Sequence, residues 1–192
     1  MKTEINKDRR TLTDLLKEGS IGCEVGVFKG DFSRQLLDSG KFKKLYLIDP
    51  FTGVVGSGDK DGRNHESWDG KELRKFVKNR FLQEWNEGIV YLGNEYSYEF
   101  FSPEELCLIE AFDRLFNFVY LDSDHSFENV KNELNLCWDF VEEGGIIAGH
   151  DYNLEGAGVE QAVTEFCEER GIDWFVLTGD GLHSFYFYKK EI

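Results

Sequence analysis

The sequence predicts an α/β fold in which a mostly parallel sheet carries helices on both faces. Three observations lead to this prediction. The apolar stretch I-G-C-E-V-G-V-F-K-G at residues 21–30 passes through glycines into an amphipathic segment, which is the pattern of a strand, a tight turn and a helix. Strand-length apolar runs and helical segments then alternate along the chain. The last two apolar runs have only a short glycine turn between them, which predicts an antiparallel hairpin.

The spacing of apolar residues gives the elements in order. Three-and-four spacing predicts helices at residues 7–18, 31–39, 71–87, 102–111, 126–141 and 159–169. After a first strand that begins at residue 21, short apolar runs predict parallel strands at 45–49, 89–92, 117–122 and 146–149. Several of these strands close on an acid.

Two further segments flank these elements. Residues 1–19 are expected to form an N-terminal segment around the first helix, with Gly19 as its stop. Residues 52–70 are rich in Gly, Asp and Ser and show no periodicity. A loop of this length directly after a strand predicts a flexible segment on the substrate side of the sheet.

Length and charge limit the organisation of the chain and the class of partner. The chain has 192 residues, enough for a full central sheet, and shows no internal repeat, so we expect a single domain over residues 1–192. A formal net charge of −15 leaves no basic stripe to neutralise phosphates, which argues against nucleic acid. The expected partner is a small molecule.

The cysteines and the N-terminal residues indicate the compartment. Each cysteine lies in or beside an apolar run without a C-x-x-C pair, so we expect free buried thiols at Cys23, Cys107, Cys137 and Cys167. The stretch M-K-T-E-I-N-K-D-R-R lacks an apolar signal core, and no apolar run approaches membrane-spanning length. These observations predict a cytoplasmic protein with no membrane partner.

The glycine-rich stretch has the chemistry of a ligand-binding turn. Gly22, Gly26 and Gly30 are four residues apart, unlike the G-x-G-x-x-G that binds a dinucleotide pyrophosphate. We expect glycine there because a ligand lies against bare backbone and because the turn requires positive φ. Glu24 would repel a pyrophosphate but suits a ligand with an ammonium group. A glycine turn without a ligand is the alternative.

Polar side chains gather where the predicted parallel strands end. They are Glu24, Asp49, Asp122, His150 and Asp151. The carboxyl ends of parallel strands share one edge of an α/β sheet, so these groups should line one crevice. Asp49, at the end of the second strand, has the two acceptor oxygens that can hold both hydroxyls of a ribose.

Two longer motifs carry a resemblance to a known family. E-V-G-x-x-x-G resembles the first motif of class I S-adenosylmethionine (SAM) methyltransferases. D-S-D-H-S-F-E-N-V at 122–130 with G-G-I-I-A-G-H-D-Y at 144–152 is similar to methyltransferase domain family 24, and the resemblance covers about residues 21–188. It implies a Rossmann-like class I methyltransferase fold, with a mostly parallel seven-stranded sheet, an antiparallel last strand and helices on both faces.

The resemblance also implies how the cofactor SAM is held. Glu24, Gly26 and Gly30 would hold its methionine end, and Asp49 its ribose. Asn94, which follows the third strand, stands at the position that contacts adenine, where the family often has an acid. Asp122 would lie near both the cofactor and the reacting centre.

A similarity to metal-dependent O-methyltransferases implies a cation site at Asp122, His150 and Asp151. A divalent cation, Mg²⁺ or Mn²⁺, would lower the pKa of an acceptor hydroxyl and fix its direction of attack. The imidazole of His150 favours Mn²⁺ and other transition metals over Mg²⁺. Without a metal, His125 or His150 would serve as the general base, so the catalytic candidates are Asp122, His125 and His150.

The sequence therefore predicts SAM-dependent methyl transfer to a small-molecule or sugar-like acceptor, at a hydroxyl oxygen. A SAM-binding module without turnover and a nucleotide- or NAD-dependent oxidoreductase are the alternatives. His125 packed under its loop with backbone partners is the structural alternative to a catalytic role. The acceptor atom, oxygen or nitrogen, and the oligomeric state, a homodimer included, stay open.

Overall fold

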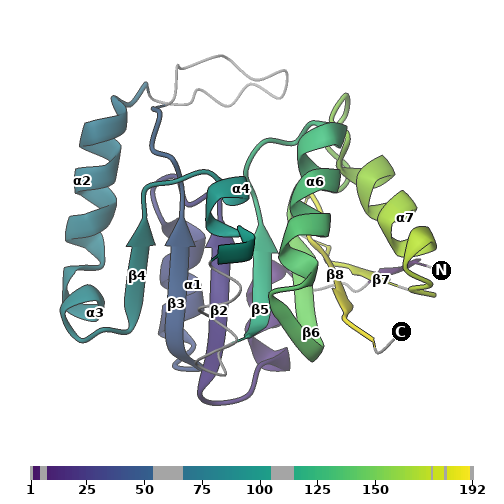
Figure 1. Cartoon of the computed structure of the whole chain (residues 1–192), viewed down its shortest axis with the longest axis horizontal. Helices are drawn as coiled ribbons and strands as arrows, with labels where there is room; N and C mark the ends of the chain where they lie inside the picture. The colour runs from purple at the N-terminus through teal and green to yellow at the C-terminus, as the bar shows by residue number, and fades with distance from the viewer. Residues whose placement is uncertain are drawn as a thin grey trace.

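An eight-stranded sheet with the order β1-β7-β8-β6-β5-β2-β3-β4 runs through the centre of the computed structural model (Figure 1). The structure describes residues 2–4, 8–53, 67–104, 115–173, 175–179 and 181–190. The strands are β1 (Lys2–Glu4), β2 (Ser20–Val25), β3 (Phe42–Ile48), β4 (Val90–Gly93), β5 (Phe116–Leu121), β6 (Val141–Gly149), β7 (Phe175–Leu177) and β8 (Phe185–Tyr188).

Helices cover both faces of this sheet. The described helices are the 3-10 helix η1 (Arg9–Leu15) and the α-helices α1 (Asp31–Asp38), α2 (Gly70–Arg80), α3 (Leu82–Asn86), α4 (Ser97–Phe100), α6 (Phe127–Trp138) and α7 (Val159–Glu169). In Figure 1, α4 and α6 lie in front of the sheet and α1 lies behind it. No helix in the described ranges is long and apolar enough to cross a bilayer.

The predicted sheet is confirmed, with one strand added. β2, β3, β4, β5 and β6 pair in parallel, and β8 pairs antiparallel with both β6 and β7. The last strand is therefore the antiparallel one, as the resemblance implies. The extra strand is β1, which pairs in parallel with β7 at the sheet edge. Three residues are too few to show a strand periodicity, so the sequence did not predict it.

Three helix predictions differ from the structure, and one of them, 126–141, is shorter because α6 ends at Trp138 and β6 begins at Val141. The predicted helix 71–87 is divided into α2 and α3 at Phe81, whose backbone leaves helical geometry at φ −113° and ψ 22° while its side chain is buried. The N-terminal helix 7–18 is shorter and of the 3-10 type. Residues 105–111 of the predicted helix 102–111, and residues 54–66 of the predicted loop 52–70, lie outside the described residues.

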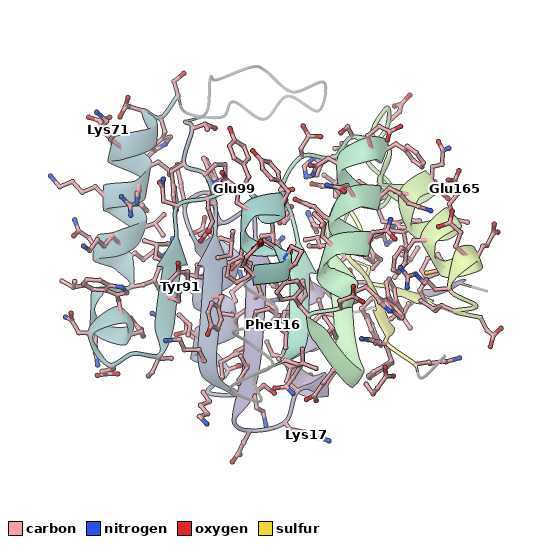
Figure 2. All side chains as sticks on the ribbon, viewed as in Figure 1. Lys17, Lys71, Tyr91, Glu99, Phe116 and Glu165 are labelled. Carbon is pink, nitrogen blue, oxygen red and sulfur yellow. The ribbon has the colours of Figure 1, made fainter. Side chains whose placement is uncertain are left out.

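The core consists of one apolar layer on each face of the sheet. Figure 2 labels Phe116, a β5 residue of one of these layers. Side chains alternate along a strand, so Cys23 and Val25 on β2 pack in the layer below α6. Tyr120 on β5 packs in the opposite layer with Phe32 of α1 and Leu12 of η1. Glu24 lies between Cys23 and Val25 and therefore faces the side of α1 and η1.

Candidate active site

The predicted polar residues meet at the carboxyl ends of the central strands, tied together by backbone hydrogen bonds. The N–H of Gly26 donates to Ile48 O (2.9 Å), that of Asp122 to Val25 O (2.8 Å), and that of His150 to Leu121 O (3.1 Å). These bonds continue the strand pairing one residue beyond each strand, so they hold the turns after β2, β5 and β6 at fixed positions.

The glycines of the turn are required by the packing of the chain itself. Gly26 and Gly30 have φ of +87° and +75°, as expected. A Cβ at Gly26 would lie 2.1 Å from the carbonyl oxygen of Asp122, and one at Gly30 would lie 2.6 Å from the ring of Phe81. The close neighbours of these two positions are thus protein atoms, and the glycines bring the turn against Asp122, just after β5, and against Phe81, between α2 and α3.

Asp49 holds the same turn closed. Its Oδ2 accepts hydrogen bonds from the N–H groups of Val27 and Phe28, both at 3.0 Å, and its Oδ1 accepts one from the N–H of Phe51 at 2.7 Å. A carboxylate offers about four acceptor positions, so most of this group's capacity is used within the chain. Asn94, the other predicted nucleoside contact, is exposed directly after β4.

Glu24 is a buried acid with unsatisfied hydrogen-bonding capacity. Only 1% of the residue is exposed, and its Oε2 has no hydrogen-bond partner among the described residues. Burial raises the pKa of Glu24 to about 8, and the negative charges of Asp122 and Asp49 act in the same direction. A cationic ligand group beside this carboxyl would offset the cost of its charge.

A cluster of two acids and two histidines lies beyond β5 and β6. Nε2 of His125 is 3.0 Å from Oδ2 of Asp151 and 3.7 Å from Oδ1 of Asp122. Nδ1 of His150 is 3.1 Å from Oδ1 of Asp151 and 3.9 Å from Oδ1 of Asp122. Asp151 is buried and adopts φ of +55°, a conformation that a residue other than glycine rarely takes.

The acids and the histidines of this cluster stabilise one another's charged forms. Burial alone would lower the pKa of His125, but Asp122 and Asp151 outweigh it and raise the pKa to about 10. Burial acts against ionisation of Asp151, but His125 and His150 hold its pKa well below the usual range. The two acids therefore favour the protonated form of His125, and a metal ion bound at its ring nitrogen would take the place of that proton.

The donor atoms of the cluster fit a divalent cation. One ligand atom each from Asp122, His125 and Asp151 lies within 4.8 Å of the others. Asp151 Oδ1 and His125 Nε2 are buried, and their close polar neighbours within the described residues are the ion-pair partners at 3.1 and 3.0 Å. Two carboxylates and an imidazole suit Mn²⁺ and similar metals. The structure thus brings together His125 with the two predicted acids, whereas the sequence favoured His150.

The loop that carries these residues is braced by helix α6. Ser123 Oγ donates to the buried carboxyl of Glu133 (2.7 Å to Oε1), and Nδ2 of Asn129 donates to Ser123 Oγ (3.1 Å) and to Asp124 O (3.0 Å). Oδ1 of Asp124 accepts the N–H of Ser126, the N-cap residue of α6 (2.8 Å), and so closes the turn that leads into the helix. The loop after β5 is therefore fixed by side chains of its own motif.

Sequence reasoning missed Arg9. Its Nη1 lies 3.3 Å from Asp122 Oδ2 and 3.4 Å from the hydroxyl of Tyr120, and its guanidinium carbon lies 4.7 Å from the centre of the Phe32 ring. Arg9 belongs to η1, far from every motif in sequence. The next residue is also an arginine, Arg10, and its side chain faces solvent. Nothing in the sequence therefore shows which of the two reaches the site.

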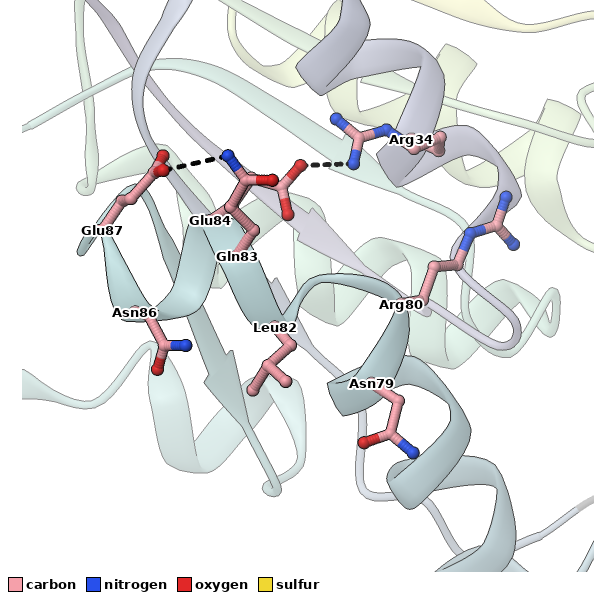
Figure 3. Close-up of a pocket in the computed structure, with 8 residues that line it drawn as sticks. All are labelled: Arg34, Asn79, Arg80, Leu82, Gln83, Glu84, Asn86 and Glu87. Atoms are coloured by element: carbon pink, nitrogen blue, oxygen red, sulfur yellow. Dashed lines mark hydrogen bonds and ion pairs between the residues drawn. The ribbon is translucent and has the colours of Figure 1, made fainter.

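A cavity of about 600 Å³ lies at a different place, between α1 and the turn from α2 to α3 (Figure 3). Its polar side chains are largely engaged with one another: Arg34 pairs with Glu84 at 2.5 Å, and Gln83 donates to Glu87 at 3.0 Å. Figure 1 shows α3 at the amino end of the sheet, away from the strand-end groups. We therefore place the candidate active site at the strand ends.

Solved structures share this fold at low sequence identity. A SAM-dependent O-methyltransferase from Thermotoga maritima matches with a TM-score of 0.59 at 14% identity, over 95% of this chain and 63% of that one. An O-methyltransferase from Bacillus cereus in complex with SAH gives 0.57 at 14% identity, over 92% and 77%. The N-methyltransferase NodS from Bradyrhizobium japonicum gives 0.59 at 14% identity, over 95% and 95%.

The chain thus covers less than two thirds of the Thermotoga protein, and none of the curated proteins compared with it matches. A family described as a methyltransferase domain matches residues 23–152, from the second half of β2 to the tyrosine that follows Asp151. That range holds the glycine turn, Asp49, the loop after β5 and the His150–Asp151 pair. It is also more than half of the chain, so the protein belongs to this family of methyltransferase domains.

Proposed function

We propose that the protein transfers a methyl group from SAM to a hydroxyl oxygen of a small-molecule or sugar-like acceptor, with a divalent cation at the acid–histidine cluster. The observation that carries the proposal is the buried carboxyl of Glu24, whose Oε2 has no hydrogen-bond partner among the described residues, beside the glycine turn and at the same strand ends as the cluster. The fold neighbours, which include an O-methyltransferase in complex with SAH, support the choice of SAM.

The cofactor would lie across the turn after β2. Glu24 would bind its ammonium group and lose its own proton in doing so, since the charged carboxylate is then paired. Asp49 would hold the turn and accept a ribose hydroxyl at its remaining acceptor position, and Asn94 would lie towards the adenine. Fixing the cofactor through both ends orients its methyl group towards the cluster, which supplies the geometric part of the rate enhancement.

The cluster would prepare the acceptor. A divalent cation held by Asp122, His125 and Asp151 would lower the pKa of the acceptor hydroxyl and fix its angle. His150, whose Nδ1 contacts Asp151, would accept the hydroxyl proton as the oxygen bonds to the methyl carbon. The carbon–sulfur bond breaks at the same time, and its electron pair stays on sulfur.

The test is a transfer assay with SAM labelled in its methyl group, Mn²⁺ and a panel of catechols and hydroxylated sugars. We expect label on a hydroxyl oxygen of at least one acceptor, and loss of that label in Asp122→Asn. Binding of SAH without transfer to any acceptor would favour the binding module. Binding of NAD in preference to SAH would favour an oxidoreductase.

A further inference from the structure

The positively charged guanidinium of Arg9 lies on the same face of the sheet as the buried carboxyl of Glu24. Arg9 is held by the hydroxyl of Tyr120 (3.4 Å), Oδ2 of Asp122 (3.3 Å) and the face of the Phe32 ring (4.7 Å). Tyr120 is in turn the cross-strand partner of Glu24 in the register of β2 and β5. Side chains of directly paired residues on one face of a sheet are neighbours, so Arg9 reaches the layer in which Glu24 lies.

The position of Arg9 is fixed by its own short helix. Oδ1 of Asp8 caps η1 by accepting the N–H of Arg10 at 2.9 Å, and Leu12, one turn after Arg9, is fully buried in the layer with Phe32. Arg9 keeps about a quarter of its side chain exposed, 26%, so the guanidinium lies at the boundary between this layer and solvent. It therefore borders the site without being sealed into the core.

Glu24 and Arg9 together present one carboxyl group and one cationic guanidinium on the same side of the turn. The charge of Arg9 acts on the Glu24 carboxyl, opposing the effect of burial. An amino-acid group carries an ammonium and a carboxylate on one carbon, and it is complementary to such a pair. A guanidinium presents N–H groups in a planar fork that matches a carboxylate.

We propose that Arg9 binds the α-carboxylate of the cofactor while Glu24 binds its α-ammonium group, so that the two residues together select the amino-acid end of SAM. This inference rests on the proposed function. It adds a binding residue that lies before residues 23–152, the range of the family match. Asp122 Oδ2 already accepts a contact from Arg9, which shows that the guanidinium presents an N–H to a carboxylate at this place.

The experiment compares two ligands that differ by one carboxylate. Calorimetry gives the dissociation constants of SAH and of decarboxylated SAH, which keeps the ammonium group, for the wild type and for Arg9→Gln. We expect Arg9→Gln to weaken SAH about 10- to 100-fold, the range for a charge-assisted hydrogen bond, and to leave decarboxylated SAH unchanged. Arg9→Lys keeps the charge without the planar fork and should recover part of the loss.

Two controls separate this effect from damage to the fold. Arg10→Gln removes the neighbouring arginine of η1, whose side chain is 71% exposed, and should leave both affinities at the wild-type values. Glu24→Gln should weaken both ligands, because both carry the ammonium group.

The outcomes are distinct. Equal weakening of both ligands in Arg9→Gln, or no weakening of either, would overturn the role of Arg9. If the wild type bound neither ligand, the proposed function itself would fail. Binding of SAH by the wild type together with an unchanged Arg9→Gln would leave the proposed function intact and reject the inference alone.

Discussion

The carboxyl of Glu24 changes its charge with pH and with the ligand beside it. Burial raises its pKa in the folded chain to about 8, whereas the value for an exposed glutamate is 4.5. The folded state therefore binds this proton more tightly than the unfolded state does. The resulting stability is fully present below pH 4.5 and is lost as pH rises through about 8.

A first prediction follows for Glu24→Gln in the absence of ligand. Between pH 4.5 and pH 8, Glu24 is ionised in the unfolded chain but protonated in the folded one. The unfolding free energy of the wild type should therefore fall by up to about 1.4 kcal/mol per pH unit, and the variant should lack this contribution. Urea unfolding at pH 6 and pH 8 measures the difference between the two slopes. Parallel slopes would mean that Glu24 ionises in the folded protein as it does in water.

A second prediction concerns Asp49. Asp49→Ala should stay folded but lose SAH binding, and its unfolding free energy should fall by about 1–3 kcal/mol because three backbone N–H groups lose their acceptor. Calorimetry with SAH and urea unfolding check the two parts. Asp38→Ala, which removes an exposed partner of Arg34, is the control and should change neither. SAH binding at wild-type strength in Asp49→Ala would make the ribose assignment wrong.

At the scale of single residues, the sequence predicted where the acids lie but not every side chain that contacts them. Glu24, Asp49, Asp122 and Asp151 follow from one rule, that parallel strands end at a common edge. Both histidines lie near both acids, but His125 is the one grouped with the two acids as a candidate metal ligand, and its place depends on the loop after β5, which Ser123 and Asn129 brace. The contact of Arg9 with Asp122 joins residues 113 positions apart, and no local pattern encodes it.

The turn between β2 and α1 is the element on which the site depends, and it gives a third prediction. Gly26 and Gly40 both have positive φ, +87° and +68°. A Cβ at Gly26 would meet backbone atoms of Asp122, whereas one at Gly40 would meet nothing within 4 Å. Gly40→Ala should cost about 1–2 kcal/mol of unfolding free energy for the left-handed conformation alone. Gly26→Ala should cost clearly more and should weaken SAH binding.

Urea unfolding of the two glycine variants checks this, with SAH titration of each folded variant. Similar costs at the two positions would mean that the turn can move away from β5, and the fixed geometry assigned to it would be wrong.

Elements with a strong periodicity were predicted from the sequence, and the exceptions have physical causes. The apolar stripe of α6 and the parallel runs of β3 and β5 stand out because each buries one face or both. The division of 71–87 was missed because apolar spacing continues across it. The break comes from tertiary packing, in which the buried ring of Phe81 lies against Gly30. β1 exists only through its pairing with β7.

At the scale of the whole molecule, the sheet brings residues that follow separate strands to the proposed cation site, and this gives a fourth prediction. Mn²⁺ titration followed by electron paramagnetic resonance should show binding to the wild type and loss of it in Asp122→Asn and His125→Ala. His150→Ala should weaken binding less, because His150 lies outside the group of three donor atoms. The opposite order of the two histidine variants would restore His150 as the ligand.

The central claim is that this methyltransferase domain binds SAM at the strand ends through Glu24 and its turn. Its most direct test is calorimetric titration of SAH into the protein, once with Mn²⁺ and once with a chelator. We predict saturable binding in both conditions, because Glu24 and Asp49, the predicted cofactor contacts, are not among the three clustered metal donors. Absence of binding in both conditions would contradict the claim, and the family fold would then have to serve another ligand.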